Sequence, residues 1–223
     1  MGKKKDTSLQ TYAYTYLKTK ILNCEILPGA CIDEKKILEK LDVGKTPFRE
    51  ALLLLQSEHL VEAKPRHGLF VSKLTTQDVR EVFSIRKMIE PIVTIEYLDR
   101  IDLSALMEND THLKQLTEQS QEKDMFALCR TDMDFHTFFI KNSGNSRLIR
   151  LLTSIFQDAY RISMYNAVLS GTYDQTWKET YVQHHQILQA ILREDKKEII
   201  NTYTMHLNYY MVSILRNLAA LKK

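Results

Sequence analysis

The 223-residue sequence is poor in glycine, proline and cysteine, with six, four and three residues of each type. The cysteines Cys24, Cys31 and Cys129 form no CxxC pair, and their odd number excludes a complete set of disulfide bonds. This usage favours a reducing compartment, which we expect to be the cytoplasm. No apolar run approaches the roughly 20 residues that cross a bilayer, and no apolar core of a signal peptide follows the basic start MGKKK. The sequence therefore predicts no contact with a membrane.

Length and composition are those of an ordinary globular protein, with 44% hydrophobic and 26% charged residues, and they suit two small domains. The charge is spread unevenly along the chain. Residues 1–73 carry 13 Lys or Arg against 9 Asp or Glu, whereas residues 74–223 carry 18 against 19. The basic excess therefore lies in the first third, where it would suit a polyanionic partner.

The stretch from Asp33 to Ser57 has the pattern of a helix–turn–helix. Asp33 can cap a first helix, and Gly44 breaks that helix. We expect Thr46 to cap a second helix, with Pro47 in its first position, where a missing N–H costs nothing. Apolar residues of the second helix recur at offsets of 0, 3, 4 and 7, which predicts one buried stripe: Phe48, Ala51, Leu52 and Leu55.

Two short strand-like runs, Leu60–Lys64 and Gly68–Ser72, follow the second helix and flank a cationic tip. This arrangement predicts a wing beside a helix that enters the major groove of DNA. A plain pair of helices packed on a β-hairpin is the alternative. In the winged reading we expect the following residues to contact DNA: Lys35, Lys45, Thr46, Arg49, Arg66, His67 and Gly68.

Helical patterns dominate the rest of the chain. A first helix opens at Thr7 or Ser8, a linker covers residues 74–77, and a capping box at Thr75 and Asp78 starts a long helix that Pro91 should kink or interrupt. Further helices are predicted at 103–123, 124–141, 146–170, 173–193 and 195–221. The fold class is therefore mostly α, with a winged helix–turn–helix domain at 1–73 and an antiparallel all-helical bundle at 78–223.

Four polar side chains interrupt the apolar faces of three predicted helices: Asp132, His136, His184 and His206. Each histidine taken alone is more often a satisfied core residue, and His59, His112 and His185 keep that interpretation. Together the four can satisfy one another by sharing a divalent metal ion, and this donor set fits zinc, nickel, manganese or iron. An octahedral ion would keep two open positions for water or an acid.

The first domain also resembles a known family. Three segments resemble, in order and spacing, the DNA-binding domain of GntR-type bacterial transcription regulators: Pro28-Gly29, Thr46–Leu52 (TPFREAL) and Gly68–Val71 (GLFV). The chain differs from the family pattern at three positions. Gly44 stands where the family usually has Ser or Thr, Lys45 where it usually has Arg, and His59 where it usually has Gly. Lysine keeps the positive charge but loses the bidentate fork that fits guanine, so base preference should differ.

The second domain resembles the FCD ligand-binding domain of the FadR branch of that family. The resemblance lies in D-x-x-F-H at 132–136, N-S-G-N at 142–145, H-x-x-I-L-x-A-I at 184–191, a histidine 22 residues later, and R-x-x-x-E at 86–90. It implies that the four polar residues above are metal ligands. It also implies a homodimer on a palindromic operator and a small carboxylate effector at the metal. Effector contacts are then expected at Arg86, Tyr160, Arg161, Tyr165 and Tyr203. Arg86 has an equally good alternative role in an ion pair with Glu90.

Two other functions fit the same residues. A metal-dependent enzyme could use an Asp/His set with open positions to activate water, but no general base stands at a suitable spacing and no glycine-rich loop could form a lid. The second alternative function is a regulator whose metal ion has a purely structural role. We therefore predict a metabolite-responsive, DNA-binding regulator rather than an enzyme.

Overall fold

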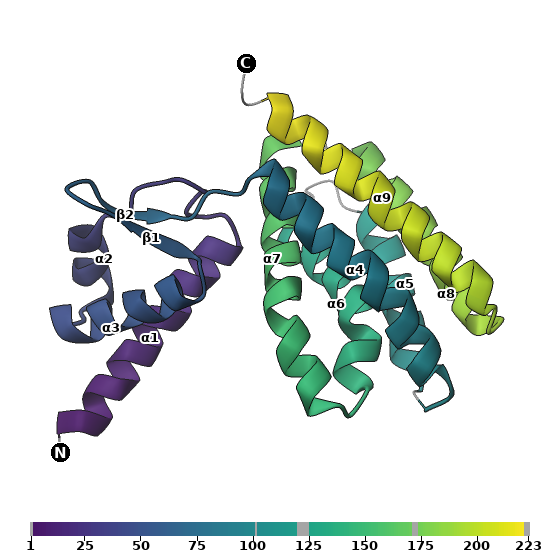
Figure 1. Cartoon of the computed structure of the whole chain (residues 1–223), viewed down its shortest axis with the longest axis horizontal. Helices are drawn as coiled ribbons and strands as arrows, with labels where there is room; N and C mark the ends of the chain where they lie inside the picture. The colour runs from purple at the N-terminus through teal and green to yellow at the C-terminus, as the bar shows by residue number, and fades with distance from the viewer. Residues whose placement is uncertain (1, 101, 120–124, 171–173, 221–223) are drawn as a thin grey trace. The chain divides into compact units, whose positions relative to one another are not determined.

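The computed structural model describes residues 2–100, 102–119, 125–170 and 174–220. It divides into two compact units, Met1–Leu74 and Thr75–Lys223 (Figure 1). The first helix of the second unit begins at Thr76, inside the segment 74–77 that the sequence assigns to the linker. No helix among the described residues is both long and apolar enough to cross a membrane.

The N-terminal unit is three helices and a β-hairpin, in the order α1 (Gly2–Leu22), α2 (Glu34–Leu41), α3 (Lys45–Ser57), β1 (Val61–Lys64) and β2 (Gly68–Val71). The strands are antiparallel, with Val61 opposite Val71 and Lys64 opposite Gly68. The predicted stripe of α3 is buried against α1 in a single core cluster. The helix–turn–helix and the wing are therefore confirmed. Helix α1 begins at Gly2, so the predicted start at Thr7 or Ser8 was wrong.

The two helices of the helix–turn–helix begin in different ways. Asp33 caps α2 as predicted, because its Oδ1 accepts a hydrogen bond of 3.0 Å from the backbone N of Lys36. The predicted cap of α3 at Thr46 was wrong. Gly44 is the N-cap residue, in an extended conformation and without a side-chain hydrogen bond. Pro47 therefore sits in the third position of α3, where its missing N–H is still among the four that lack a helical acceptor.

Helix α3 ends in a left-handed turn centred on His59, whose φ is 57°. The backbone N of His59 donates to Gln56 O, and that of Leu60 donates to Leu55 O, which is the hydrogen-bond pattern of a Schellman motif. This motif favours glycine, because a side chain in the left-handed region costs roughly 1–2 kcal/mol. The strain explains why the GntR-type pattern carries glycine at this place.

Replacing His59 by glycine should therefore raise the free energy of unfolding by about 1 kcal/mol, as strain relief outweighs the extra freedom of the unfolded chain. Urea unfolding of the full chain measures the change. His59→Ala is the matched control, because alanine removes the imidazole but keeps the Cβ and hence the strain. A glycine variant no more stable than the alanine variant would contradict the explanation.

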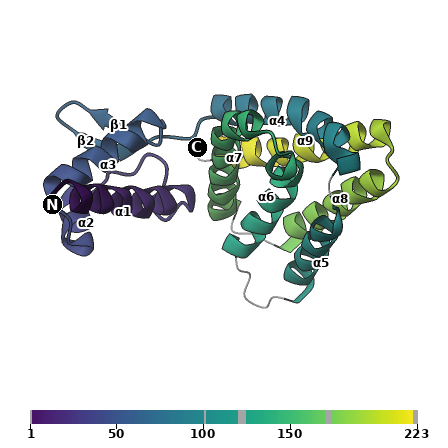
Figure 2. The same ribbon diagram turned by 90° about the horizontal axis from the view of Figure 1, so that it is seen from below.

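The C-terminal unit is helical throughout its described residues. It comprises α4 (Thr76–Tyr97), the 3-10 helix η1 (Leu98–Arg100), α5 (Ser104–Gln119), α6 (Met125–Asn142), α7 (Ser146–Ser170), α8 (Asp174–Leu192) and α9 (Lys196–Ala220). Helix α4 packs on α9, α6 and α7, and α8 lies between α9 and α5. Figure 2 shows α4 and α9 side by side along one edge of the bundle. The predicted helices are confirmed, while their predicted ends near 120–123, 173 and 221 lie outside the described residues.

Helix α4 begins with a capping box and contains a proline in its interior. The predicted capping box at its start is confirmed: Thr75 and Asp78 each accept a hydrogen bond from the other's backbone N–H. The predicted interruption at Pro91 was wrong, because the helix runs on to Tyr97. Proline removes one backbone hydrogen bond, and we attribute the continuity of the helix to its packing on α6, α7 and α9.

Candidate metal centre and nucleic-acid interface

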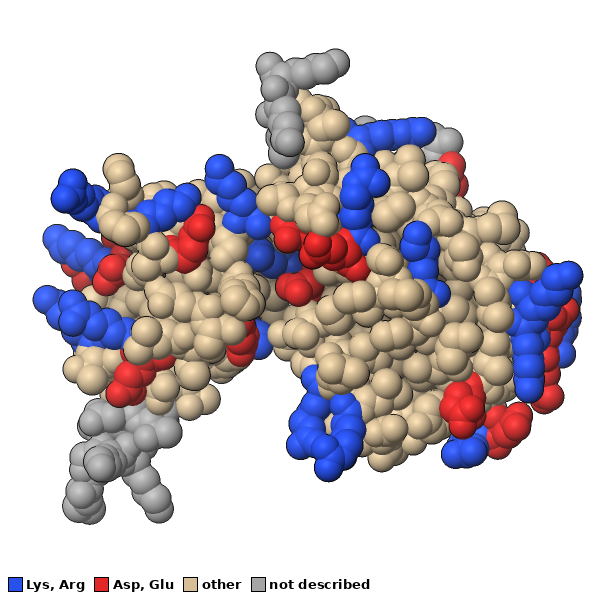
Figure 3. Space-filling model, viewed as in Figure 1, with Lys and Arg blue, Asp and Glu red and all other residues tan. Residues whose placement is uncertain are grey.

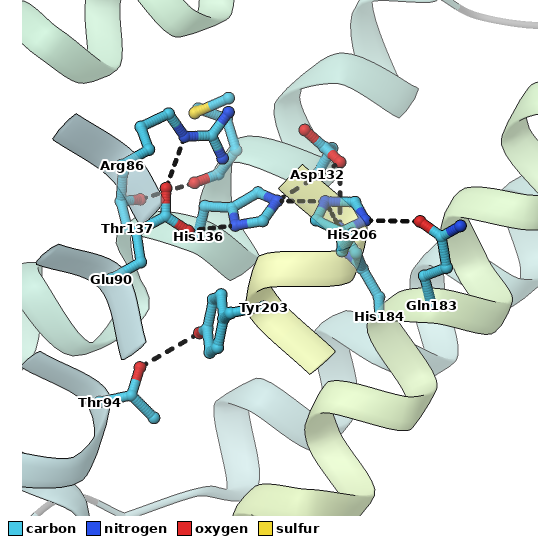
Figure 4. A network of polar contacts seen from close by, with 11 residues as sticks. Arg86, Glu90, Thr94, Asp132, His136, Thr137, Gln183, His184, Tyr203 and His206 are labelled. Atoms are coloured by element: carbon cyan, nitrogen blue, oxygen red, sulfur yellow. Dashed lines mark hydrogen bonds and ion pairs between the residues drawn. The ribbon is translucent and has the colours of Figure 1, made fainter. Parts of the chain in front are cut away.

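Three helices bring the four predicted metal ligands together inside the bundle (Figure 4). Helix α6 supplies Asp132 and His136, one turn apart, while α8 supplies His184 and α9 supplies His206. All four residues are at most 4% exposed. One donor atom from each lies within 4.8 Å of the other three. This is the size of a single coordination sphere.

The Nε2 atoms of the histidines face one another. His206 Nε2 lies 3.1 Å from His136 Nε2 and 3.3 Å from His184 Nε2. Asp132 Oδ1 completes the group, 3.2 Å from His184 Nε2 and 3.9 Å from His136 Nε2. Three nitrogens and one carboxylate oxygen therefore converge on one point.

Neighbouring side chains fix which ring nitrogen carries the proton. His136 Nδ1 donates to Glu90 Oε2 at 2.7 Å, and His206 Nδ1 donates to Gln183 Oε1 at 2.9 Å. With the proton on Nδ1, the neutral form of either ring presents a lone pair at Nε2, and two such lone pairs 3.1 Å apart cannot hydrogen-bond to each other. A cation between them would satisfy both, and outer partners of this kind are typical of metal-ligating histidines. The residues present therefore fit a divalent metal ion.

Burial keeps two of the three histidines in the uncharged form that a metal needs. It lowers the pKa of His184 and lowers that of His206 well below the ordinary value, so both rings are neutral at pH 7. Burial alone would raise the pKa of Asp132, but a hydrogen bond from His184 and nearby positive charge lower it below its usual range. Neutral imidazole and ionised carboxylate are the metal-binding forms.

The His184 ring lies in different surroundings from the other two. It stacks on Phe135 with ring centroids 4.4 Å apart, and within the part of the chain that the structure describes its Nδ1 has no hydrogen-bond partner. The neighbouring His185 points elsewhere, with Nδ1 3.0 Å from Asp110 Oδ2 on α5. This separation agrees with the choice of His184 over His185 from the sequence.

The predicted DNA-contacting residues all lie exposed on the N-terminal unit: Lys35, Lys45, Thr46, Arg49, Arg66, His67 and Gly68. Figure 3 shows Lys and Arg side chains around α2, α3 and the hairpin, together with acidic ones. A groove of about 460 Å³ lies between α3 and the hairpin, with Arg49 and Arg66 among its lining residues. Arg66 holds a φ of 66° at the hairpin tip, a left-handed conformation that places a cation at the end of the wing.

Comparison with known proteins identifies both units. The family described as bacterial regulatory proteins, gntR family, matches residues 9–71, and the FCD domain matches residues 81–209. The chain belongs to the GntR family. Its FCD domain places this GntR regulator in the FadR branch, as the resemblance of both halves of the sequence indicated.

The transcriptional repressor RspR from Escherichia coli K12 is 31% identical to this GntR regulator over 204 residues, which is 90% of this chain and 86% of RspR. A GntR structure from Rhodococcus sp. RHA1 matches with a TM-score of 0.79 at 21% identity, over 93% of this chain and 98% of that one. The metal-free FCD domain of TM0439 matches with a TM-score of 0.56 at 20% identity, over 67% and 99%. The two structures establish the fold, and the sequence relatives show a transcriptional regulator rather than an enzyme.

Two of the predicted effector contacts of this GntR regulator lie beside the histidines. Tyr203 has its ring centroid 6.3 Å from that of His136, and its hydroxyl is 3.1 Å from Thr94 Oγ1. Arg86 is buried and its Nε donates to Glu90 Oε1 at 2.5 Å, which is the ion pair foreseen as its alternative role. Arg86 Nη2, however, has no hydrogen-bond partner among the described residues. The other predicted contacts, Tyr160, Arg161 and Tyr165, lie on α7.

Sequence patterns do not point to the two residues that orient the histidines. The R-x-x-x-E pattern indicates Glu90 only as a partner of Arg86, and no pattern singles out Gln183 beside His184. A polar residue next to a ligand on an apolar helix is a weak signal. Only the packing of α8 on α9 turns Gln183 toward His206.

Gln183→Ala should lower the metal affinity of the GntR regulator roughly 10–100-fold, because His206 loses the acceptor that holds its ring and tautomer. Competition with a fluorescent zinc chelator measures the affinity. Gln186→Ala is the matched control, since Gln186 is exposed on the same helix. Equal affinities of the two variants would show that Gln183 does not orient the site.

The metal-free protein should lose stability as the pH falls from 7 to 5. His184 and His206 take up protons below about pH 6.5 in the unfolded chain, but their lowered pKa values keep them neutral when folded. The unfolded state then binds more protons, so the free energy of unfolding falls by up to about 1.4 kcal/mol per pH unit for each histidine. Urea unfolding with chelator present at pH 7, 6 and 5 measures the slope. His206→Gln should flatten it, whereas the exposed His112→Gln should not.

Proposed function

We propose that this protein is a homodimeric regulator that binds a palindromic operator through its N-terminal unit and senses a small carboxylate metabolite through its C-terminal unit. The observation that carries the proposal is the buried meeting point of three imidazole nitrogens and one carboxylate, in a chain whose other unit is a winged helix–turn–helix. A regulator that acts on operator DNA would work in the cytoplasm, where we propose that this protein acts.

Asp132, His136, His184 and His206 would hold one divalent metal ion. The mixed nitrogen and oxygen donors suit zinc, nickel, manganese or iron, and four protein ligands leave two positions on an octahedral ion. Such an ion supplies a positive charge inside an apolar bundle, where it attracts an anionic ligand.

A carboxylate is the effector class that best suits the surroundings of the cluster. Arg86 keeps an unpartnered Nη2 in the buried site, and a guanidinium fork suits carboxylate geometry. Tyr203 adds an aromatic ring beside His136, and its hydroxyl lies 3.1 Å from Thr94 Oγ1. Tyr160, Arg161 and Tyr165 on α7 are further proposed contacts. The effector changes DNA binding only if its affinity differs between the DNA-bound and free arrangements.

The test begins with selection of an operator from a random duplex library by the full-length protein. Operator affinity is then measured for the metal-free protein, the zinc-loaded protein, and the zinc-loaded protein with a panel of small dicarboxylic and hydroxy acids. We expect at least one acid to change the affinity of the zinc-loaded protein only. A metal that raises thermal stability while no acid changes DNA binding would favour the alternative of a purely structural metal.

A further inference from the structure

Helix α3 exposes a large apolar side chain on the side that we expect to face DNA. This residue is Leu53, which is 63% exposed. It follows Lys45 and Arg49 at intervals of four residues, and residues four apart share one face of a helix. The three side chains therefore lie along one side of α3, apart from the stripe that packs in the core. A single exposed leucine is ordinary on a protein surface, so its surroundings decide what it can bind.

Leu53 lies in the groove between α3 and the hairpin, where apolar and cationic side chains meet. Among the described residues that line this groove, Leu52, Ala63 and Leu69 add apolar surface to that of Leu53. The charged lining residues are three cations and one acid: Arg49, Lys64, Arg66 and Glu34. The excess of cations favours a polyanion, while the apolar surface favours a partner that also presents an apolar group.

Double-stranded DNA presents both kinds of group along its major groove. Phosphates follow the two edges of the groove, and the apolar group that the bases present inside it is the C5-methyl group of thymine. Four residues of helix rise about 6 Å, which is less than the groove depth of about 8.5 Å. Leu53 is therefore still inside the major groove when Arg49, one turn closer to the start of α3, reaches the base edges.

We propose that Leu53 contacts the C5-methyl group of a thymine in each half-site of the operator, and so selects thymine beside the base pair that Arg49 reads. This inference rests on the operator binding of the proposed function and adds a specificity-determining residue to it. A leucine side chain forms no hydrogen bonds, so it recognises thymine only through the apolar surface that the contact buries. Cytosine lacks the methyl group and leaves Leu53 without that contact.

Replacement of thymine by uracil tests the contact in the full-length protein, because uracil pairs as thymine does and lacks only the methyl group. The wild type selects an operator from a random duplex library, and each thymine of one half-site is then replaced in turn. We expect one replacement to weaken wild-type binding about fourfold, the effect of removing one buried methyl-sized group. The same replacement should not change the affinity of Leu53→Ala, because this variant has already lost the contact.

Leu54→Ala is the matched control. Leu54 is 42% exposed on the same helix but lies outside the set of described residues that line the groove. This variant should keep the wild-type ratio between its affinities for the thymine and uracil operators. The ratio separates a methyl contact from a structural effect, since a damaged fold weakens binding to both operators equally. Circular dichroism verifies that each variant is folded.

A repeated selection with Leu53→Gln gives an independent readout. Glutamine can hydrogen-bond to adenine N6 and N7 but does not recognise the methyl group of thymine. We expect the preference for thymine to fall at the position that the uracil scan identifies, while the base read by Arg49 keeps its preference. An unchanged preference for thymine at that position would contradict the assigned role.

The inference and the proposed function can fail separately. A wild type that selects an operator but tolerates every uracil replacement would overturn the inference and leave the proposed function intact. So would a Leu53→Ala variant with the wild-type ratio, because the methyl contact would then belong to another side chain. A Leu53→Ala variant with unchanged affinity for every operator would also overturn it, and would favour an acidic protein segment as the occupant of the groove. A wild type that selects no DNA sequence would overturn the proposed function itself.

Discussion

His206→Ala and His184→Ala are expected to abolish metal binding, from one zinc per chain in the loaded wild type to none. Each removes a nitrogen from the centre of the cluster, and His206 Nε2 is the atom that lies within 3.3 Å of both other histidine nitrogens. The measurement is elemental analysis after zinc loading and gel filtration. The loaded wild type should also unfold at a higher temperature than either variant, since a ligand that binds only the folded state stabilises it.

His185→Ala is the control for this experiment, because His185 is adjacent in sequence but contacts Asp110 on α5. It should keep one zinc per chain. The helical content of the N-terminal unit should be unchanged in all three variants, since its core is a separate cluster. A wild type that cannot be loaded, or a loss of zinc confined to the His185 variant, would refute the assignment.

Arg49→Ala should weaken specific DNA binding by about 1–3 kcal/mol if Arg49 makes a bidentate base contact. Arg49 is exposed on α3 and lines the groove beside the wing, and the α3 stripe that packs in the core leaves it free for DNA. Titration of a selected operator and of scrambled DNA at two salt concentrations separates base contacts from phosphate contacts.

Lys45→Ala provides the comparison, because a lysine at the start of α3 acts as a point charge. It should weaken binding to both DNAs equally. It should also lower the slope of log affinity against log salt concentration by about 1, which is the contribution of one phosphate contact. Equal losses on operator and scrambled DNA for Arg49→Ala would reassign Arg49 to the phosphate backbone.

Local sequence patterns predicted the structure correctly where a feature depends on a single helix. The buried stripe of α3, the cap at Asp33 and the box at Thr75 depend on neighbours within one helical turn, and the structure has all three. Asp132 and His136 were placed on one face for the same reason. The start of α3 was misplaced at Thr46 because glycine and threonine are both acceptable N-cap residues, and sequence alone does not decide between them.

The meeting of α6, α8 and α9 could not be derived from spacing. The apolar helix faces that carry the four polar residues predicted a shared core, and the resemblance indicated the same four residues. Spacing does not show their contact, since residues 132 and 206 are brought together only by the packing of the bundle. The roles of Glu90 and Gln183 depend on interhelical distances of a few ångströms, which no periodicity encodes.

The order of the helices along the chain has a consequence for synthesis. Helix α4 is the first of its unit to be made, yet it packs on α9, the last, and α9 also carries His206. A growing chain that ends before Lys196 has three of the four side chains of the proposed metal site and lacks the helix on which α4 packs. Contacts of such long sequence separation form late in folding. Tight capture of the proposed metal ion would therefore require α9, and a chain whose synthesis stalls before Lys196 would not retain the ion.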